Sequence, residues 1–308
     1  MANLKIRQTR LAVLYYSSRP NFLILTALLT ALTIACLYWA GYPLSSGLAL
    51  LVTIAALLVH AIVNWFNEVY DARAGLDNIT QRTPFNGGSG SLQLEPEAIN
   101  FVERVALGAL GAVILFGFYI VWLWDWRIVP LGLLGLLVIF SYSPWMTRHP
   151  FLGWSSPGFG LGVVMMMGIA FALTGAYPVW LIAVTLLPFL LINNLLLLNQ
   201  FPDQVADQKV GRRTLPLAIG DRQALRVFKI TIWVSLAWLL LLIIFQALPV
   251  LSIIALVGFL PALGIWAKLQ PGFTQTPDAI VVLRQNVVMI LGVIILLTLS
   301  LVISAWLG

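Results

Sequence analysis

Two clusters of polar residues, each at the end of a long apolar run, hold the residue types best suited to chemistry in this sequence. The first occupies residues 64–77 (NWFNEVYDARAGLD) and the second residues 203–207 (DQVAD). Carboxylates placed this closely repel one another unless a cation neutralises them. Mg²⁺ favours carboxylate oxygens, commonly takes one or two of them, and completes its shell with water and substrate phosphates. The clusters therefore predict Mg²⁺ bound together with a phosphorylated ligand.

The polar residues of each cluster recur at helical spacing. In the first cluster they are His60, Asn64, Asn67 and Asp71, and in the second they are Asn199, Asp203 and Asp207. Residues three or four apart lie on one face of a helix. Because polar groups facing lipid are costly, both faces are expected to line a protein cavity. Pro202 lacks an N–H group, which predicts a kink or a restart of the helix just before the second pair of carboxylates.

Basic residues follow each cluster. Arg82 follows the first, whereas Lys209, Arg212 and Arg213 follow the second. A metal ion combined with Arg and Lys is a common way to bind a diphosphate. The glycine-rich stretch 86–90 (NGGSG) could add backbone N–H groups, although such a stretch alone is a weak signal. Since the surrounding runs are apolar, a prenyl diphosphate satisfies both halves of this description.

The elements that position these clusters are predicted to be membrane-spanning helices. The chain has 308 residues, of which 61% are hydrophobic and 9% charged, with a mean hydropathy of +0.98. Such a chain lacks the polar surface of a soluble domain and is expected to be an all-α, polytopic membrane protein. The net charge of +6 is read as positive cytoplasmic loops, so no nucleic-acid partner is expected.

Nine spans are predicted within a single domain covering residues 1–308. They are residues 22–40, 46–66, 100–121, 128–143, 157–175, 179–199, 227–247, 250–267 and 285–306. With the N-terminus in the cytoplasm, Arg127 is the only basic residue assigned to an outside loop, as the positive-inside rule requires. Both clusters then lie on the cytoplasmic side of the membrane, which would be the inner membrane in a bacterium.

A transporter is the competing class of protein. Secondary transporters place polar residues and broken helices near the middle of the bilayer. Here the carboxylates gather at the predicted cytoplasmic ends of the spans, and the outside loops carry almost no polar groups. An enzyme is therefore the favoured interpretation, and transport is kept as the weaker alternative.

The two motifs resemble those of the UbiA superfamily of intramembrane prenyltransferases. The resemblance rests on residues 67–71, Gly75 and Asp77, and on residues 199–215, and with nine spans it covers essentially the whole chain. The Gly-x-Asp ending of the first motif, residues 211–215 (GRRTL) and the later Ile219-Gly220 resemble the 1,4-dihydroxy-2-naphthoate polyprenyltransferase branch of menaquinone synthesis. The resemblance implies a helical bundle around a central cavity that opens sideways to membrane lipid. It also implies Mg²⁺-dependent transfer from a polyprenyl diphosphate to an aromatic acceptor.

The resemblance also implies roles for individual residues. One Mg²⁺ would be held by Asn67, Asp71 and Asp77, and the other by Asp203 and Asp207. The diphosphate would be bound by Lys209, Arg212 and Arg82, next to Arg19, Tyr142 and Ser143. Glu68 departs from the Asp that is usual after the Asn. Alternative acceptors are 4-hydroxybenzoate, homogentisate, a porphyrin-like ring and a glycerol phosphate lipid.

Overall fold

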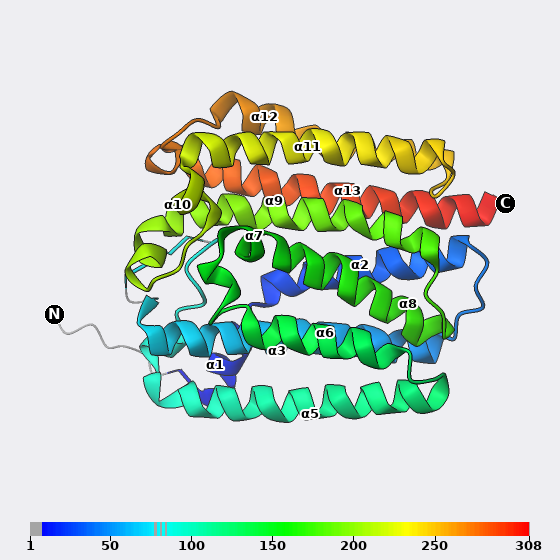
Figure 1. Cartoon of the computed structure of the whole chain (residues 1–308), viewed down its shortest axis with the longest axis horizontal. Coiled ribbons are helices and arrows are strands. Elements are labelled where there is room, and N and C mark those ends of the chain that lie inside the picture. The colour runs from blue at the N-terminus through cyan, green and yellow to red at the C-terminus, as the bar shows by residue number, and fades with distance from the viewer. Residues whose placement is uncertain (1–7, 77–78, 81, 84, 308) are drawn as a thin grey trace.

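The computed structural model describes residues 8–76, 79–80, 82–83 and 85–307. In this part of the chain the regular structure is helical, apart from one isolated bridge between Thr83 and Asn86. The long helices lie side by side in a bundle, with α10 (Leu215–Ile219) and the C-terminal end of α13 (Ala279–Leu307) at opposite ends (Figure 1). The predicted all-α fold is confirmed.

Eight helical stretches in the described ranges are long and apolar enough to cross a membrane. They are α2 (Pro20–Trp39), α3 (Ser46–Ala74), η2–α5 (Pro96–Leu123), α7–η4–α8 (Pro150–Thr174), α9 (Val179–Lys209), α11 (Asp221–Ile244), η5–α12 (Val250–Lys268) and α13 (Ala279–Leu307). The predicted fourth span is the shorter α6 (Ile128–Ser141), with 14 residues. A crossing needs about 20 residues, so the count of nine spans is approximate.

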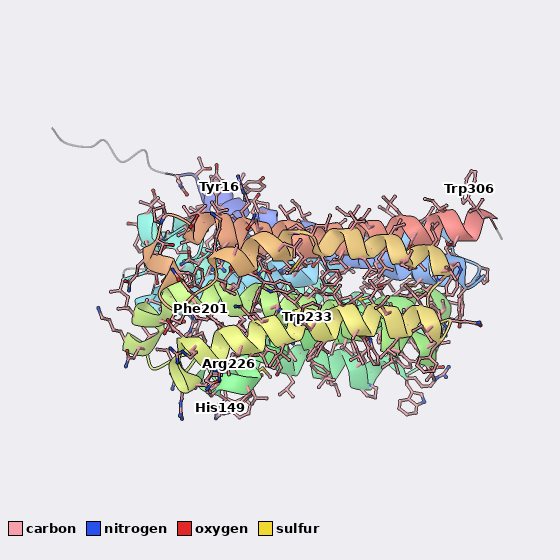
Figure 2. All side chains as sticks on the ribbon, turned by 90° about the horizontal axis from the view of Figure 1, so that it is seen from above. Tyr16, His149, Phe201, Arg226, Trp233 and Trp306 are labelled. Atoms are coloured by element: carbon pink, nitrogen blue, oxygen red, sulfur yellow. The ribbon has the colours of Figure 1, made fainter. Side chains whose placement is uncertain are left out.

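Short helices join or flank these stretches. They are α1 (Arg10–Ser17), α4 (Ser91–Leu94), η3 (Met146–Arg148), α10 (Leu215–Ile219) and η6 (Phe273–Gln275). The outer face of the bundle is apolar, with Phe118 65% and Trp233 60% exposed. Because an apolar surface of this kind is stable against lipid and not against water, the chain is an integral, multi-pass membrane protein. In Figure 2, Arg226 and His149 lie toward the end of the bundle opposite Trp306.

The two helices that carry the polar clusters are longer than their apolar runs. The α3 helix begins after Ser45, whose hydroxyl accepts a hydrogen bond from the Leu48 N–H. It ends at Gly75, which has a φ of 71°, a left-handed conformation that glycine adopts without strain. The α9 helix runs unbroken through Pro202. Of the two predicted outcomes, a kink or a restart, the restart before Asp203 is therefore wrong, and Asp71, Asp203 and Asp207 all lie on regular helix.

The span between α6 and α9 is irregular. Here α7 (Pro150–Gly158) contains Pro157 and passes into a π-helix, η4 (Phe159–Met165), before α8 (Met166–Thr174). Proline removes one backbone donor, and π-helical turns often mark functional sites. Gly162 packs closely here, since a Cβ atom at this position would lie 2.7 Å from the Phe189 N atom. The irregular segment faces the cavity described below.

Candidate active site

A buried ion-pair network joins the C-terminal turns of α3 and α9. The Arg212 guanidinium donates to Asp71 on α3 and, at 3.4 Å, to the Oδ1 atom of Asp207 on α9. The three side chains are only 15%, 9% and 6% exposed, respectively. Burial alone lowers the pKa of Arg212, but the carboxylates of Asp71 and Asp207 outweigh it and raise the pKa above its ordinary value. The guanidinium therefore remains charged between two carboxylates contributed by different helices.

The glycine-rich loop reaches the second carboxylate of α9. Asn86 Nδ2 donates to Asp203 Oδ1 at 2.5 Å, while the Asn86 side-chain Oδ1 accepts from the Thr83 hydroxyl. The next two residues, Gly87 and Gly88, have φ values of 85° and 70°. Only glycine takes up such conformations in succession without steric cost. The loop thus turns over the network and brings its backbone to the cavity.

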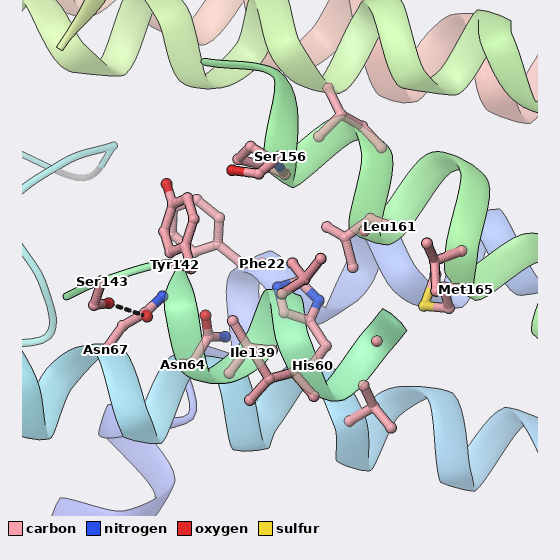
Figure 3. A pocket seen from close by; sticks show the side chains of 18 of the residues that line it. Phe22, His60, Asn64, Asn67, Ile139, Tyr142, Ser143, Ser156, Leu161 and Met165 are labelled. Atoms are coloured by element: carbon pink, nitrogen blue, oxygen red, sulfur yellow. Dashed lines mark hydrogen bonds between the residues drawn. The ribbon is translucent and has the colours of Figure 1, made fainter. Parts of the chain in front are cut away.

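Residues at the end of α6 complete this polar region. Ser143 Oγ donates to Asn67 Oδ1 at 2.5 Å, as drawn in Figure 3. The neighbouring Tyr142 also lines the cavity. Two other members of the predicted α3 face have structural partners: His60 Nδ1 lies 2.7 Å from Thr26 Oγ1 on α2, and Asn64 Nδ2 donates to the Ser18 carbonyl at 2.8 Å. His60 and Asn64 therefore hold α2 and the residue after α1 against α3, and all four residues of the predicted α3 face line the cavity.

These residues surround the head of a cavity of about 600 Å³. The predicted site residues among its lining are Arg19, Asn67, Asp71, Tyr142, Ser143, Asp203, Asp207 and Arg212, and His60, Asn64 and Asn199 of the two predicted helix faces line it as well. Farther in, the walls are apolar, with Ile139, Leu161 and Met165 pointing into the space in Figure 3. A cavity that is charged at one end and apolar along its length fits a ligand with an anionic head and a hydrocarbon chain.

Three predicted site residues are not placed at the cavity. Lys209 is exposed at the end of α9, and neither it nor Arg82 is among the described lining residues. Arg82 instead donates to the Gly87 carbonyl at 3.0 Å in its own loop and to Gln93 Oε1 at 2.7 Å in α4. Asp77 lies outside the described residues. Their proposed contacts with a ligand remain predictions.

Two contributors were missed as such in the sequence. Asn86 lies in the glycine-rich stretch, but nothing in that stretch indicates that its side chain contacts Asp203. Glu68 is fully buried and is hydrogen-bonded to Arg19 and Ser89. The position of Glu68 between Asn67 and Asp71 indicates that it lies near the site. It does not indicate which segments its carboxylate joins.

The donor set fits Mg²⁺. Among the described residues, no three His, Cys, Asp or Glu side chains are grouped so that they could hold a metal ion by themselves. The carboxylates come instead as one on α3 and two on α9, with the Asn67 amide nearby. Mg²⁺ typically binds one or two carboxylates and takes its other ligands from water and substrate phosphates. Arg212, already between Asp71 and Asp207, shows that this position accommodates positive charge.

The fold and the site together define a polytopic membrane protein with a cavity that is charged at one end and apolar along its length. The UbiA prenyltransferase family matches residues 27–287. The chain therefore belongs to the UbiA prenyltransferase family and is a prenyltransferase.

Similar proteins agree with this membership. The 1,4-dihydroxy-2-naphthoate octaprenyltransferase of Bacillus subtilis (strain 168) is 26% identical over 235 residues, which cover 75% of this chain and 74% of that protein. A UbiA homolog from Archaeoglobus fulgidus bound to GPP and Mg²⁺ has a TM-score of 0.68 at 14% identity, covering 94% of this chain and 99% of that one. A structure from a study of digeranylgeranylglyceryl phosphate synthase in membranes has a TM-score of 0.63 at 17% identity, covering 95% and 99%. The two structures share the fold of this chain.

Proposed function

We propose that the protein transfers a prenyl group from a polyprenyl diphosphate to an aromatic acceptor in a Mg²⁺-dependent reaction, with 1,4-dihydroxy-2-naphthoate as the favoured acceptor. The observation that carries the proposal is the meeting of Asp71, Asp207 and Arg212 at the charged head of an otherwise apolar cavity. The charged head binds the diphosphate and the apolar length takes the prenyl chain.

The metal and the basic residues have complementary tasks in this proposal. Asn67, Asp71, Asp203 and Asp207 are the described residues that would hold Mg²⁺, with Asp77 as a further predicted ligand. Bound Mg²⁺ would supply charge stabilisation for the departing diphosphate. Arg212 and Arg19 line the same space and would donate hydrogen bonds to the phosphate oxygens. Lys209 and Arg82 would reach the diphosphate only through a change of position.

In the proposed reaction the diphosphate leaves at the charged head of the cavity, and the new bond forms next to its apolar wall. The allylic C–O bond breaks, and its electron pair leaves with the diphosphate. An electron-rich aromatic carbon donates the pair that forms the new C–C bond, and loss of a proton or of CO₂ restores the aromatic ring. The apolar cavity wall keeps water away from the allylic cation, which limits hydrolysis of the donor.

The choice of acceptor is supported by the curated relative and by the motifs. The B. subtilis relative is named for its naphthoate acceptor, and residues 211–215 resemble that branch. A glycerol phosphate lipid is the second candidate, since one structure of the same fold comes from work on a digeranylgeranylglyceryl phosphate synthase. The cytoplasmic placement of the site is part of the same proposal and is supported by the distribution of basic residues in the loops.

A single transfer assay tests the proposal. Purified protein in lipid nanodiscs is incubated with Mg²⁺, labelled geranyl diphosphate and one acceptor at a time from the five named classes. We expect prenylation of 1,4-dihydroxy-2-naphthoate, its loss in EDTA, and its loss in Asp71→Ala protein that is still purified as a folded monodisperse species. Full activity in EDTA would contradict the metal assignment. Transfer to no acceptor, together with uptake of substrate into vesicles, would favour a transporter.

A further inference from the structure

Glu68 is a fully buried carboxylate beside the proposed metal ligands. It follows Asn67 in α3 and has 0% exposure. Among the described residues that line the cavity, Asn67 and Asp71 are present and Glu68 is not. A buried carboxylate is costly unless hydrogen bonds or charges compensate it. Its partners therefore indicate what the residue does.

Two segments far from α3 in the sequence supply those partners. Arg19 Nε donates to Glu68 Oε1 at 2.7 Å, and the Ser89 N–H donates to the same oxygen at 2.7 Å. The Ser89 hydroxyl donates to Glu68 Oε2 at 2.7 Å. Both carboxylate oxygens are thus engaged, and the short distances are those of charge-assisted hydrogen bonds. No surface of Glu68 remains for a ligand.

One partner lines the cavity and the other is next to a residue that lines it. Arg19 lines the cavity and stands immediately before α2 with a φ of 51°, a left-handed conformation that is unfavourable for a non-glycine residue. Such a conformation persists only where surrounding contacts impose it. Ser89 follows Gly88, which also lines the cavity, and lies three residues after Asn86, the partner of Asp203. Glu68 therefore ties the start of α2 and the glycine-rich loop to α3.

We propose that Glu68 is a positioning residue for diphosphate binding and does not ligate the metal. It fixes Arg19 and residues 86–89 at the head of the cavity, where the guanidinium and the loop backbone meet the phosphate oxygens of the donor. The proposal rests on the proposed function for its substrate. The Glu68 carboxylate bridges two separate segments and does not face the cavity.

The test compares Glu68→Gln with Glu68→Asp in the full-length protein. Glutamine keeps the size of the side chain but removes its charge and one acceptor oxygen. In Glu68→Gln we expect the KM for geranyl diphosphate to rise about tenfold. A change of this size corresponds to the loss of at least one charge-assisted hydrogen bond. We expect the Mg²⁺ concentration for half-maximal activity to change less than about twofold, on the reasoning that the ligands themselves are intact. Glu68→Asp should recover part of the KM effect.

Trypsin cleavage after Arg82 provides a second readout that does not need activity. Arg82 is exposed in the loop that Glu68 anchors. Release of this anchor in Glu68→Gln should accelerate cleavage at Arg82 several-fold, since proteolysis follows local opening. Ser89→Ala, which removes the hydroxyl donor without touching Glu68, should give a smaller acceleration. Glu103→Gln, which breaks an exposed ion pair with Arg73, serves as the matched control and should change neither readout.

Each outcome decides for or against the proposal. A raised Mg²⁺ requirement with an unchanged donor KM would make Glu68 a metal-site residue and overturn it. Unchanged kinetics and unchanged cleavage would show that the three hydrogen bonds position nothing. If Glu68→Gln is not recovered as folded protein, Ser89→Ala carries the same two readouts. If wild-type protein prenylates none of the acceptors, the proposed function fails, while the cleavage experiment still tests whether Glu68 anchors the loop.

Discussion

The two ends of the helix bundle each contain an Arg–Asp pair, but the pairs differ in burial and in sequence separation. At one end, Arg212 joins Asp71 across 141 positions of sequence, and the side chains are 15% and 9% exposed. At the other end, Arg127 contacts Asp125 at 2.6 Å, two residues away, with side chains 56% and 33% exposed. The local pair can form without the fold. The buried pair forms only where the ends of α3 and α9 meet, so its formation depends on the fold.

The same contrast applies to electrostatics. Hydrogen bonds from Arg127 lower the pKa of Asp125, which faces solvent and needs no further partner. Exposed pairs of this kind contribute little, because water and salt screen them. Removing one member of a buried pair leaves the other charge uncompensated, which costs far more. Substitutions at the two ends should therefore differ in both stability and activity.

The largest effect is expected for Arg212→Gln. Asp71 and Asp207 then lose the guanidinium between them, and the protein should lose about 3 kcal/mol of stability together with most transfer activity. A thermal-unfolding scan in detergent checks the first, and the transfer assay the second. Mg²⁺ should raise the Tm of this variant more than that of wild type, since a cation can replace the missing charge. If the variant and wild type had equal Tm values and equal responses to Mg²⁺, the ion-pair network would have no role in stability or in metal binding.

A smaller effect is expected for Ser143→Ala. The substitution deletes the hydrogen bond to Asn67 Oδ1 but leaves the carboxylates intact. Loss of one such bond is worth about 1 kcal/mol, or roughly fivefold. We therefore expect the Mg²⁺ concentration for half-maximal activity to rise by that factor, because the Asn67 side chain would no longer be held in its orientation. Ser141→Ala, in which the lost hydroxyl bonds only to the Leu137 carbonyl of its own helix, is the control and should behave as wild type.

The smallest effect is expected for Asp125→Asn at the opposite end. The exposed pair with Arg127 is broken, yet stability should change by less than about 0.5 kcal/mol, as for most surface substitutions. The transfer rate should remain within about twofold of wild type, which is the range of ordinary surface effects. A large loss of activity measured in the same assay would mean that both ends of the bundle take part in the reaction.

The helices could be predicted from the sequence better than their ends could. Apolar runs must be helical in a membrane because every backbone polar group has to be paired internally. Hydropathy stops at the first polar residues, and so the predicted ends at residues 66 and 199 fall short of Ala74 and Lys209, where α3 and α9 end. The polar last turns stay helical because they pack around the site. The α6 helix ends two residues before its predicted end at residue 143, and Tyr142 and Ser143 line the cavity.

Residue spacing predicted which side chains share a helix face, but not which distant segments they meet. It placed Asn67 with Asp71 and Asp203 with Asp207, and these four residues line the cavity. Charge alone did not distinguish Arg212, which lies between two carboxylates, from Arg82, which bonds within its own loop. The different partners of Arg212 and Arg82 depend on the conformations of the loops that carry them. Helical periodicity does not predict loop conformation.

The central claim is that the carboxylates of α3 and α9 act as one metal–diphosphate site. The most direct test measures Mg²⁺-dependent binding of geranyl diphosphate by titration calorimetry to wild type, Asp71→Asn, Asp203→Asn and the double variant. Groups that act as a unit give strongly non-additive losses. We predict that each single substitution removes nearly as much binding as both together. Independent, additive losses, or Mg²⁺-dependent binding that survives in the double variant, would contradict the account.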